Sequence, residues 1–133
     1  MSYKLTIKPP RNFSFRHTVG SHGWYDLPPF EHKSGTNELC YVFPVIGEQP
    51  AISVSIKKQG SDLVVELSEK TDNIVRIRDG VRHILRLDDE LEDFYRLLET
   101  DDRLAWVTRV KAGRLLRSST VWEDLVKTIC TTN

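Results

Sequence analysis

Residues 52–67 read ISVSIKKQGSDLVVEL, and this stretch decides the fold class. Ile52, Val54 and Ile56 alternate with polar residues, which is the period of a strand that buries one face. The turn-forming residues 58–62 follow, and a second apolar run then occupies residues 63–67. A strand, a short turn and another strand in direct succession predict a hairpin within an antiparallel meander.

Two further strands are expected upstream of the hairpin. Residues 3–7 alternate between apolar and polar side chains, and two prolines stop the pattern directly afterwards. Residues 39–43 are apolar at every position, which predicts a central or doubly covered strand that ends at Pro44. Residues 12–20 fit two structures, because Asn12 is able to cap a short helix while the aromatic residues also alternate as in a strand.

From Asn73 onward the apolar residues recur with the period of a helix. One side of this helix is expected to carry Ile74, Ile77, Val81, Ile84 and Leu85. Gly80 costs about 1 kcal/mol relative to alanine, so we expect tertiary packing to hold the helix in place.

Two shorter helices are expected next. Asp89 followed by Glu92 is a capping signal, and the apolar residues after it have helical spacing: Leu91, Phe94, Tyr95 and Leu98. The third helix spans residues 102–110, and we expect its Leu104, Ala105 and Trp106 to lie in the core. The class that follows is α+β, a curved antiparallel sheet covered on one face by helices.

The last helix, residues 120–130, has the strongest pattern in the chain. Thr120 and Glu123 form a capping box, in which each side chain satisfies a backbone N–H of the other. Asp124 and Lys127 lie on one side, and the opposite face is apolar: Val121, Trp122, Leu125, Val126, Ile129 and Cys130. Such a face must be buried. Either it packs back on the preceding domain, or it is the first helix of a bundle whose other members lie outside these residues.

The composition is that of an ordinary globular domain, with 39% hydrophobic and 29% charged residues. No run approaches the length of a membrane span, and residues 1–4 lack the apolar region of a signal peptide. We therefore expect a soluble, intracellular protein of the cytoplasm that does not contact membranes. Cys40 and Cys130 both lie in apolar patterns and are expected to be buried free thiols.

Charge is unevenly placed along the chain. Residues 1–102 contain 13 Lys and Arg against 17 Asp and Glu, whereas residues 103–133 contain 6 against 2. The six basic residues are Arg103, Arg109, Lys111, Arg114, Arg117 and Lys127. Because DNA is a polyanion, we expect the end of the chain to approach it, although a solvated basic surface has the same pattern.

Other candidate sites are weak. A metal site made from His17, His22 and His32 lacks the fixed spacing that zinc and iron sites need, so we expect neither metal nor cofactor. Trp24 and Tyr25 are able to stack on a base, but we expect them to pack under the sheet edge instead.

The final segment also resembles the one with which helix-hairpin-helix DNA glycosylases enter their catalytic helical domain. Members of the 3-methyladenine and 8-oxoguanine families have a basic link, an acidic residue early in the next helix, and an apolar run that ends in Ile-Cys-Ser-Ser-Asn. Thr131 and Thr132 replace the two serines, and the matching residues are Gly113, Arg114, Leu115, Leu116, Glu123, Leu125, Ile129, Cys130 and Asn133. Residues 3–10 and 13–15 resemble the start of the bacterial alkyladenine branch of the family, and residues 87–91 with 94–95 resemble the linker helix before the link.

The resemblance implies a domain organisation. Residues 1–112 would form an amino-terminal α+β domain similar to half of the TATA-binding fold, and residues 12–20 would be helical. Residues 113–133 would be the link and the first, trailing helix of a helical domain that is cut off here. The DNA-gripping hairpin and the catalytic aspartate of the family lie downstream, so this chain would hold no catalytic residue.

The implied function is removal of an alkylated or oxidised purine from duplex DNA in base-excision repair, carried out by the full-length protein. Thr131 and Thr132 would sit beside the phosphates, and Asn133 would fill the hole left by the flipped base. The plain alternative for Asn133 is a helix cap. Weak self-association through the uncovered helix face is also expected. The alternative function is a non-catalytic β-sheet module that binds nucleic acid or protein.

Overall fold

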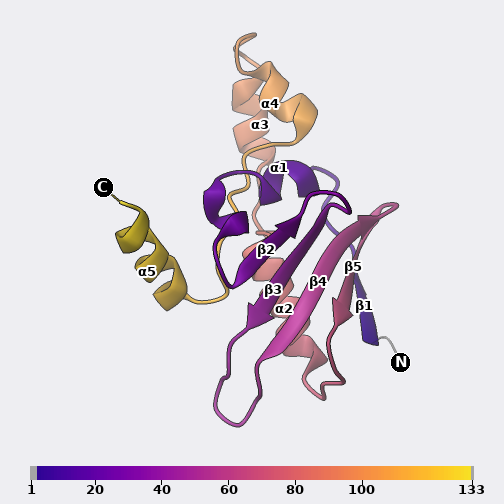
Figure 1. The fold of residues 1–133 in the computed structure, drawn as a ribbon. Coiled ribbons are helices and arrows are strands. Elements are labelled where there is room, and N and C mark those ends of the chain that lie inside the picture. The colour runs from indigo at the N-terminus through magenta and orange to yellow at the C-terminus, as the bar shows by residue number, and fades with distance from the viewer. Residues whose placement is uncertain (1–2, 133) are drawn as a thin grey trace.

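Five strands form one antiparallel sheet in the computed structural model of the chain, which describes residues 3–132. They are β1 (Tyr3–Ile7), β2 (Phe30–Lys33), β3 (Glu38–Phe43), β4 (Ile52–Gln59) and β5 (Asp62–Leu67). The order across the sheet is β1-β5-β4-β3-β2, so β2 to β5 form a meander and β1 is added beside β5 (Figure 1). The predicted hairpin is confirmed, and Gly60 at its turn has a φ of +60°, which favours glycine.

The register of the strands gathers the apolar residues on one face of the sheet. Ile56 lies opposite both Leu39 and Val65, and all three side chains are fully buried. On β3 the other face carries Cys40, which is half-buried, and Val42, which is exposed. The strand is therefore central but not doubly covered, because helices pack against only one face of the sheet.

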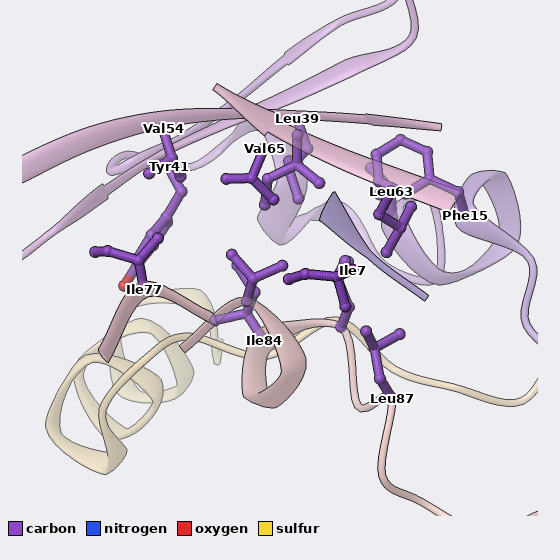
Figure 2. Packing of buried hydrophobic residues seen from close by; sticks show 14 of the residues in the cluster. Ile7, Phe15, Leu39, Tyr41, Val54, Leu63, Val65, Ile77, Ile84 and Leu87 are labelled. Carbon is purple, nitrogen blue, oxygen red and sulfur yellow. The ribbon is translucent and has the colours of Figure 1, made fainter. Parts of the chain in front are cut away.

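Helix α2 (Ile74–Ile84) covers the apolar face of the sheet, as predicted. Its N-cap is Asn73, whose side chain accepts a hydrogen bond from the backbone N–H of Arg76, and Ile77, Val81 and Ile84 point into the core. Figure 2 shows Ile77 and Ile84 facing residues of the sheet such as Val65 and Leu39. The α+β class with helices on one face is confirmed.

The remaining helices are α1 (Phe15–Val19), the 3-10 helix η1 (Gly23–Asp26), α3 (Glu92–Leu98), α4 (Ala105–Val110) and α5 (Val121–Thr131). None of the helices within residues 3–132 is long and apolar enough to cross a membrane. The helix predicted near residues 12–20 is confirmed, but it starts later than Asn12 and is capped by Ser14.

The predicted cap of α3 is wrong. Helix α3 follows Leu91 without any side-chain cap, because the carboxylate of Asp89 is paired with Arg86 instead. The predicted core position of α4 is also wrong. Helices α3 and α4 contact each other beyond the end of the sheet (Figure 1), and Trp106 is 50% exposed.

Gly80 of α2 is unfavourable for a helix by propensity, but it allows close packing of the helix against the sheet. A Cβ atom built at this position would lie 2.3 Å from Cε1 of Phe43, whose ring is buried in the core. The helix and the sheet therefore approach each other more closely at Gly80 than any side chain allows.

Replacing Gly80 by alanine should destabilise the fold. Propensity alone predicts a gain of about 1 kcal/mol, whereas overpacking costs about 1–3 kcal/mol, so we expect a net loss of up to about 2 kcal/mol in the free energy of unfolding. Chemical denaturation of Gly80→Ala measures it, with Gly35→Ala as control because nothing lies within 4 Å of that position. A stabilised Gly80→Ala would contradict the close approach.

Candidate functional site

Helix α5 is attached to the rest of the molecule by its polar face. Its one buried residue is Lys127, which is 8% exposed, whereas Trp122 is 73% and Ile129 is 65% exposed. The other apolar residues of this face also lie open: Val121, Leu125, Val126 and Cys130. Figure 1 shows α5 standing apart from the sheet at the end of its link. The expectation of a buried Cys130 and the alternative of an ordinary packed terminal helix are both wrong.

The attachment centres on the carboxylate of Glu123. The Tyr41 hydroxyl, which comes from β3, donates to Oε2 of Glu123 at 2.6 Å. Ser119 Oγ lies 2.8 Å from the same hydroxyl, and the Ser119 backbone N–H donates to it at 3.2 Å. Burial, and then the bond to Glu123, raise the pKa of Tyr41, so its phenol remains a donor at physiological pH.

Only half of the predicted capping box forms. The Thr120 side chain accepts from the backbone N–H of Glu123 at 3.2 Å, as expected. The Glu123 side chain does not return to Thr120, because both of its oxygens are used by Tyr41 and Lys127. A tertiary contact has replaced the local one.

The buried ammonium group of Lys127 is surrounded by groups that stabilise its positive charge. Its Nζ donates to Oε1 of Glu123 at 2.6 Å and to Oγ of Ser118 at 3.3 Å. The same ammonium group lies 4.6 Å from the ring centroid of Phe30 and 5.6 Å from that of Trp24. Carboxylate, hydroxyl and aromatic faces together offset the cost of burying an ammonium ion.

The link before α5 is held firmly by the sheet domain. Arg114 is 1% exposed, and its guanidinium donates to the carbonyls of Arg86 and Asp89 and to Oδ1 of Asn12, all within 2.9 Å. Burial lowers the pKa of Arg114, because desolvation disfavours the charged form, and these hydrogen bonds offset the cost of that desolvation. Asn12, expected to cap a helix, instead ties the start of the chain to the link.

An open groove of about 590 Å³ lies between η1, the link and α5. Trp24 and Leu27 form one wall, Leu115 and Leu116 line the link side, and Arg86 and Arg117 contribute two guanidinium groups. Helix α5 contributes Asp124 and Thr131. The groove combines aromatic and apolar surface with the guanidinium of Arg117, since Arg86 is paired with Asp89 and Asp124 adds a carboxylate. Such a surface suits a flat ring.

The basic end of the chain is less available than its charge count predicts. Arg114 and Lys127 are buried, and Arg103 is paired with Asp101 at 2.7 Å. Arg117 donates from Nε to the carbonyl of His83 at 2.9 Å. Burial, and then this neighbouring guanidinium, lower the pKa of His83, so the imidazole does not add positive charge at neutral pH.

The histidines of the first third are occupied by hydrogen bonds. His22 lies with Nε2 2.6 Å from the carbonyl oxygen of Leu116, and its Nδ1 accepts from the N–H of Trp24. His17 bonds to Ser14, and His32 lies 3.3 Å from Oδ1 of Asn37. Within residues 3–132 no three His, Cys, Asp or Glu residues are grouped as a metal site requires.

The expected DNA-binding residues lie at the end of α5. Thr131 and Thr132 have exposed side chains whose hydroxyls donate to the carbonyls of Lys127 and Thr128. Thr131 also lines the groove, a position that its sequence pattern did not reveal. Asn133 lies outside the described residues. The roles of these three residues toward DNA stay predictions.

The sequence did not predict that Trp24 lines the groove. This side chain is half-buried beside Lys127, as expected for packing at the sheet edge, but it also faces the groove. The sequence contained one signal of this, the aromatic pair directly before two prolines.

Comparison with known proteins bears on the fold. The sequence matches no protein-family model and no curated protein. Among solved structures, the chain is similar to a 3-methyladenine DNA glycosylase from Archaeoglobus fulgidus, with a TM-score of 0.71 and 18% sequence identity. The match covers 98% of this chain and 44% of that protein, so the chain spans less than half of its neighbour's length. The likeness shows a DNA glycosylase-like α+β fold, as the resemblance implied.

Arg114 should be indispensable for the link. Arg114→Lys supplies a charge but not a planar fork, so some of the three acceptors lose their donor, and we expect a loss of about 2–4 kcal/mol in the free energy of unfolding. The matched control is Arg109→Lys on the exposed side of α4, which should change stability by no more than about 0.5 kcal/mol. Equal effects of the two variants in thermal denaturation would show that the buried bonds contribute little.

The uncovered face of α5 should cause weak self-association of the 133-residue chain, because contiguous exposed apolar surface of this kind binds other apolar surface. Sedimentation velocity should show a coefficient that rises with protein concentration. Trp122→Glu should abolish the rise, whereas Leu97→Glu, which changes a comparably exposed leucine on α3, should not. A strict monomer at high concentration would contradict this.

Proposed function

We propose that this chain is the amino-terminal part of a base-excision repair DNA glycosylase that removes a damaged purine from duplex DNA. One observation carries the proposal, the similarity of fold over 98% of the chain, α5 included, to a protein described as a 3-methyladenine DNA glycosylase. The specific residues of the link and of α5 that resemble the family are an independent argument. Whether the purine is alkylated or oxidised is decided by the assay below.

We further propose that residues 1–112 and 113–133 belong to different domains, and that α5 opens a helical one. The support is physical. Six apolar side chains of α5 face outward, and covering a large apolar side chain stabilises a protein by about 1.5–3 kcal/mol. A helical domain packed on this face would bury them, and the neighbouring glycosylase is long enough to contain one.

The groove is proposed as one wall of the pocket for the damaged base. An enzyme that acts on a base inside a duplex must flip the base out of the stack and enclose it. Trp24 offers an aromatic surface for stacking, and the guanidinium of Arg117 favours the adjacent phosphate, whereas that of Arg86 is paired with Asp89. Thr131, Thr132 and Asn133 follow at the end of α5, where we propose that they contact the distorted duplex.

No residue of this chain is proposed as the catalyst. Asp124 is the carboxylate that lines the groove, but its Oδ1 accepts from the backbone N–H of Ser118 at 2.8 Å and supports the start of α5. The catalytic carboxylate is assigned to the helical domain, where the resembled family has it. The reaction would be hydrolysis by water, without a cofactor.

The alternative function, a module that binds through the uncovered face of the sheet, has less support. This face carries cross-strand ion pairs, in which Glu66 bonds to Lys4 at 2.8 Å and to Lys57 at 3.0 Å. Lysines that are neutralised by a neighbouring carboxylate attract a polyanion weakly.

The assay compares the 133-residue chain with a protein that continues along the natural reading frame. Both are incubated with duplexes that contain 8-oxoguanine or an alkylated adenine, and abasic sites are detected by strand cleavage in alkali. We expect no excision by the 133-residue chain, because the catalytic carboxylate is assigned to the helical domain. Its DNA binding should be weak and salt-sensitive, because much of its basic end is buried or paired. The longer protein should release a damaged purine.

Two outcomes would overturn the proposal. Excision by the 133-residue chain would mean that its own carboxylates are catalytic. Failure of the longer protein on every damaged base would favour the non-catalytic module.

A further inference from the structure

The direction in which α5 leaves the sheet domain has no obvious cause in apolar packing. The helix contributes one buried residue, Lys127, and its apolar face points away from the sheet. A helix attached only through the chain at Thr120 would be free to swing about that point. The polar contacts of its first two turns must therefore hold it.

Glu123 is the residue on which those contacts converge. One carboxylate oxygen accepts from Tyr41 of the sheet and the other accepts from Lys127 one turn along the same helix, both at 2.6 Å. Charge-assisted hydrogen bonds of this length are strongly directional. The Lys127 ammonium in turn lies 4.6 Å from the ring centroid of Phe30 in β2, so α5 contacts the sheet domain at two points, which restricts its rotation as well as its position.

Tyr41 is a rigid anchor for this bond. Its ring is 1% exposed and packs against Phe30, with ring centroids 4.4 Å apart, and against Phe43 at 5.0 Å. Figure 2 shows the Tyr41 side chain extending from the sheet with its oxygen at the outer end. Because β3 is paired on both sides, the hydroxyl cannot move without disturbing the sheet.

We propose that Glu123 is a positioning residue that, through Tyr41 and Lys127, sets the angle between α5 and the sheet domain and so the width of the groove. This inference deepens the proposed function. The orientation of α5 is argued from the contacts above, and only its consequence for base excision rests on the proposed function.

A small rotation of α5 about Thr120 would displace the far end of the helix by several ångströms. Thr131 lies 11 residues beyond Thr120, which is about 16 Å along a helix. A swing of about 20° about Thr120 would therefore displace Thr131 by about 6 Å. Thr131 and Trp24 both line the groove, so a displacement of Thr131 changes the shape and width of the groove.

The experiment measures the angle directly by pulsed electron paramagnetic resonance on the 133-residue chain. One spin label is attached to Cys130, which is exposed on α5, and the other to Thr6→Cys on the outer face of β1, in a Cys40→Ser background. The parent should show one narrow distance distribution. Tyr41→Phe retains the buried ring and both charges but removes the hydroxyl, and its distribution should shift or broaden, by up to about 5 Å at Cys130 for a swing of about 20°.

Two further variants separate positioning from simple loss of stability. Glu123→Gln removes the charge and one of the two acceptor oxygens and should broaden the distribution. Ser119→Ala removes the other side-chain partner of the Tyr41 hydroxyl without changing the carboxylate and should keep the narrow one. Asp93→Asn breaks a comparable but exposed ion pair with Arg96 and should change nothing.

A narrow, unshifted distribution in Tyr41→Phe and in Glu123→Gln would overturn the proposal and leave the network a purely stabilising role. Tyr41→Phe is the decisive variant because it leaves no charge unpaired and retains the core. The measurement uses no DNA, so its failure is distinct from failure of the excision assay.

Discussion

The hydrogen bond from Tyr41 to Glu123 connects the two parts of this molecule. The Tyr41 ring belongs to the core of the sheet domain, whereas its hydroxyl holds the first turn of α5. Strand β3 is held by pairing on both sides, and this bond therefore restricts the movement of α5, which has few other contacts with the domain. The groove between η1 and α5 exists because this helix is held at one angle, so the candidate site depends on a residue that does not line it.

Helix α5 reverses the usual orientation of an amphipathic helix. Its charged side chains are turned toward the domain, and its apolar side chains are turned away. A buried ion pair contributes little net stability, because the loss of hydration offsets the attraction, but it specifies direction. Covering the apolar face would release considerably more free energy. The polar face therefore sets the orientation of α5, and the apolar face provides the free energy for binding a further structure.

Charge counting along the chain overstated the basic surface. Arg114 and Lys127 carry positive charge into buried positions, where backbone carbonyls, hydroxyls and Glu123 satisfy it. A guanidinium that bonds the carbonyl oxygens of Arg86 and Asp89 and the Asn12 side chain cannot also bind phosphate. The electrostatic attraction of the chain for DNA is reduced accordingly, and in the groove Arg86 is also paired, with Asp89, which leaves the guanidinium of Arg117.

The sequence by itself determined β1, β3, β4 and β5, the hairpin, α2 and α5, because the period of apolar residues and the chemistry of turns and caps act over a few neighbouring positions. It also identified the face of α5 that needs a cover. It did not predict β2, whose residues Phe30–Lys33 include a single buried apolar side chain. Tertiary structure alone decided how side chains with local alternatives were used. Asn12 bonds to Arg114, 102 residues away, and Glu123 bonds to Tyr41, 82 residues away, and both bonds displaced a predicted cap. The groove arises from the same cause, since its walls come from distant segments that only folding brings together.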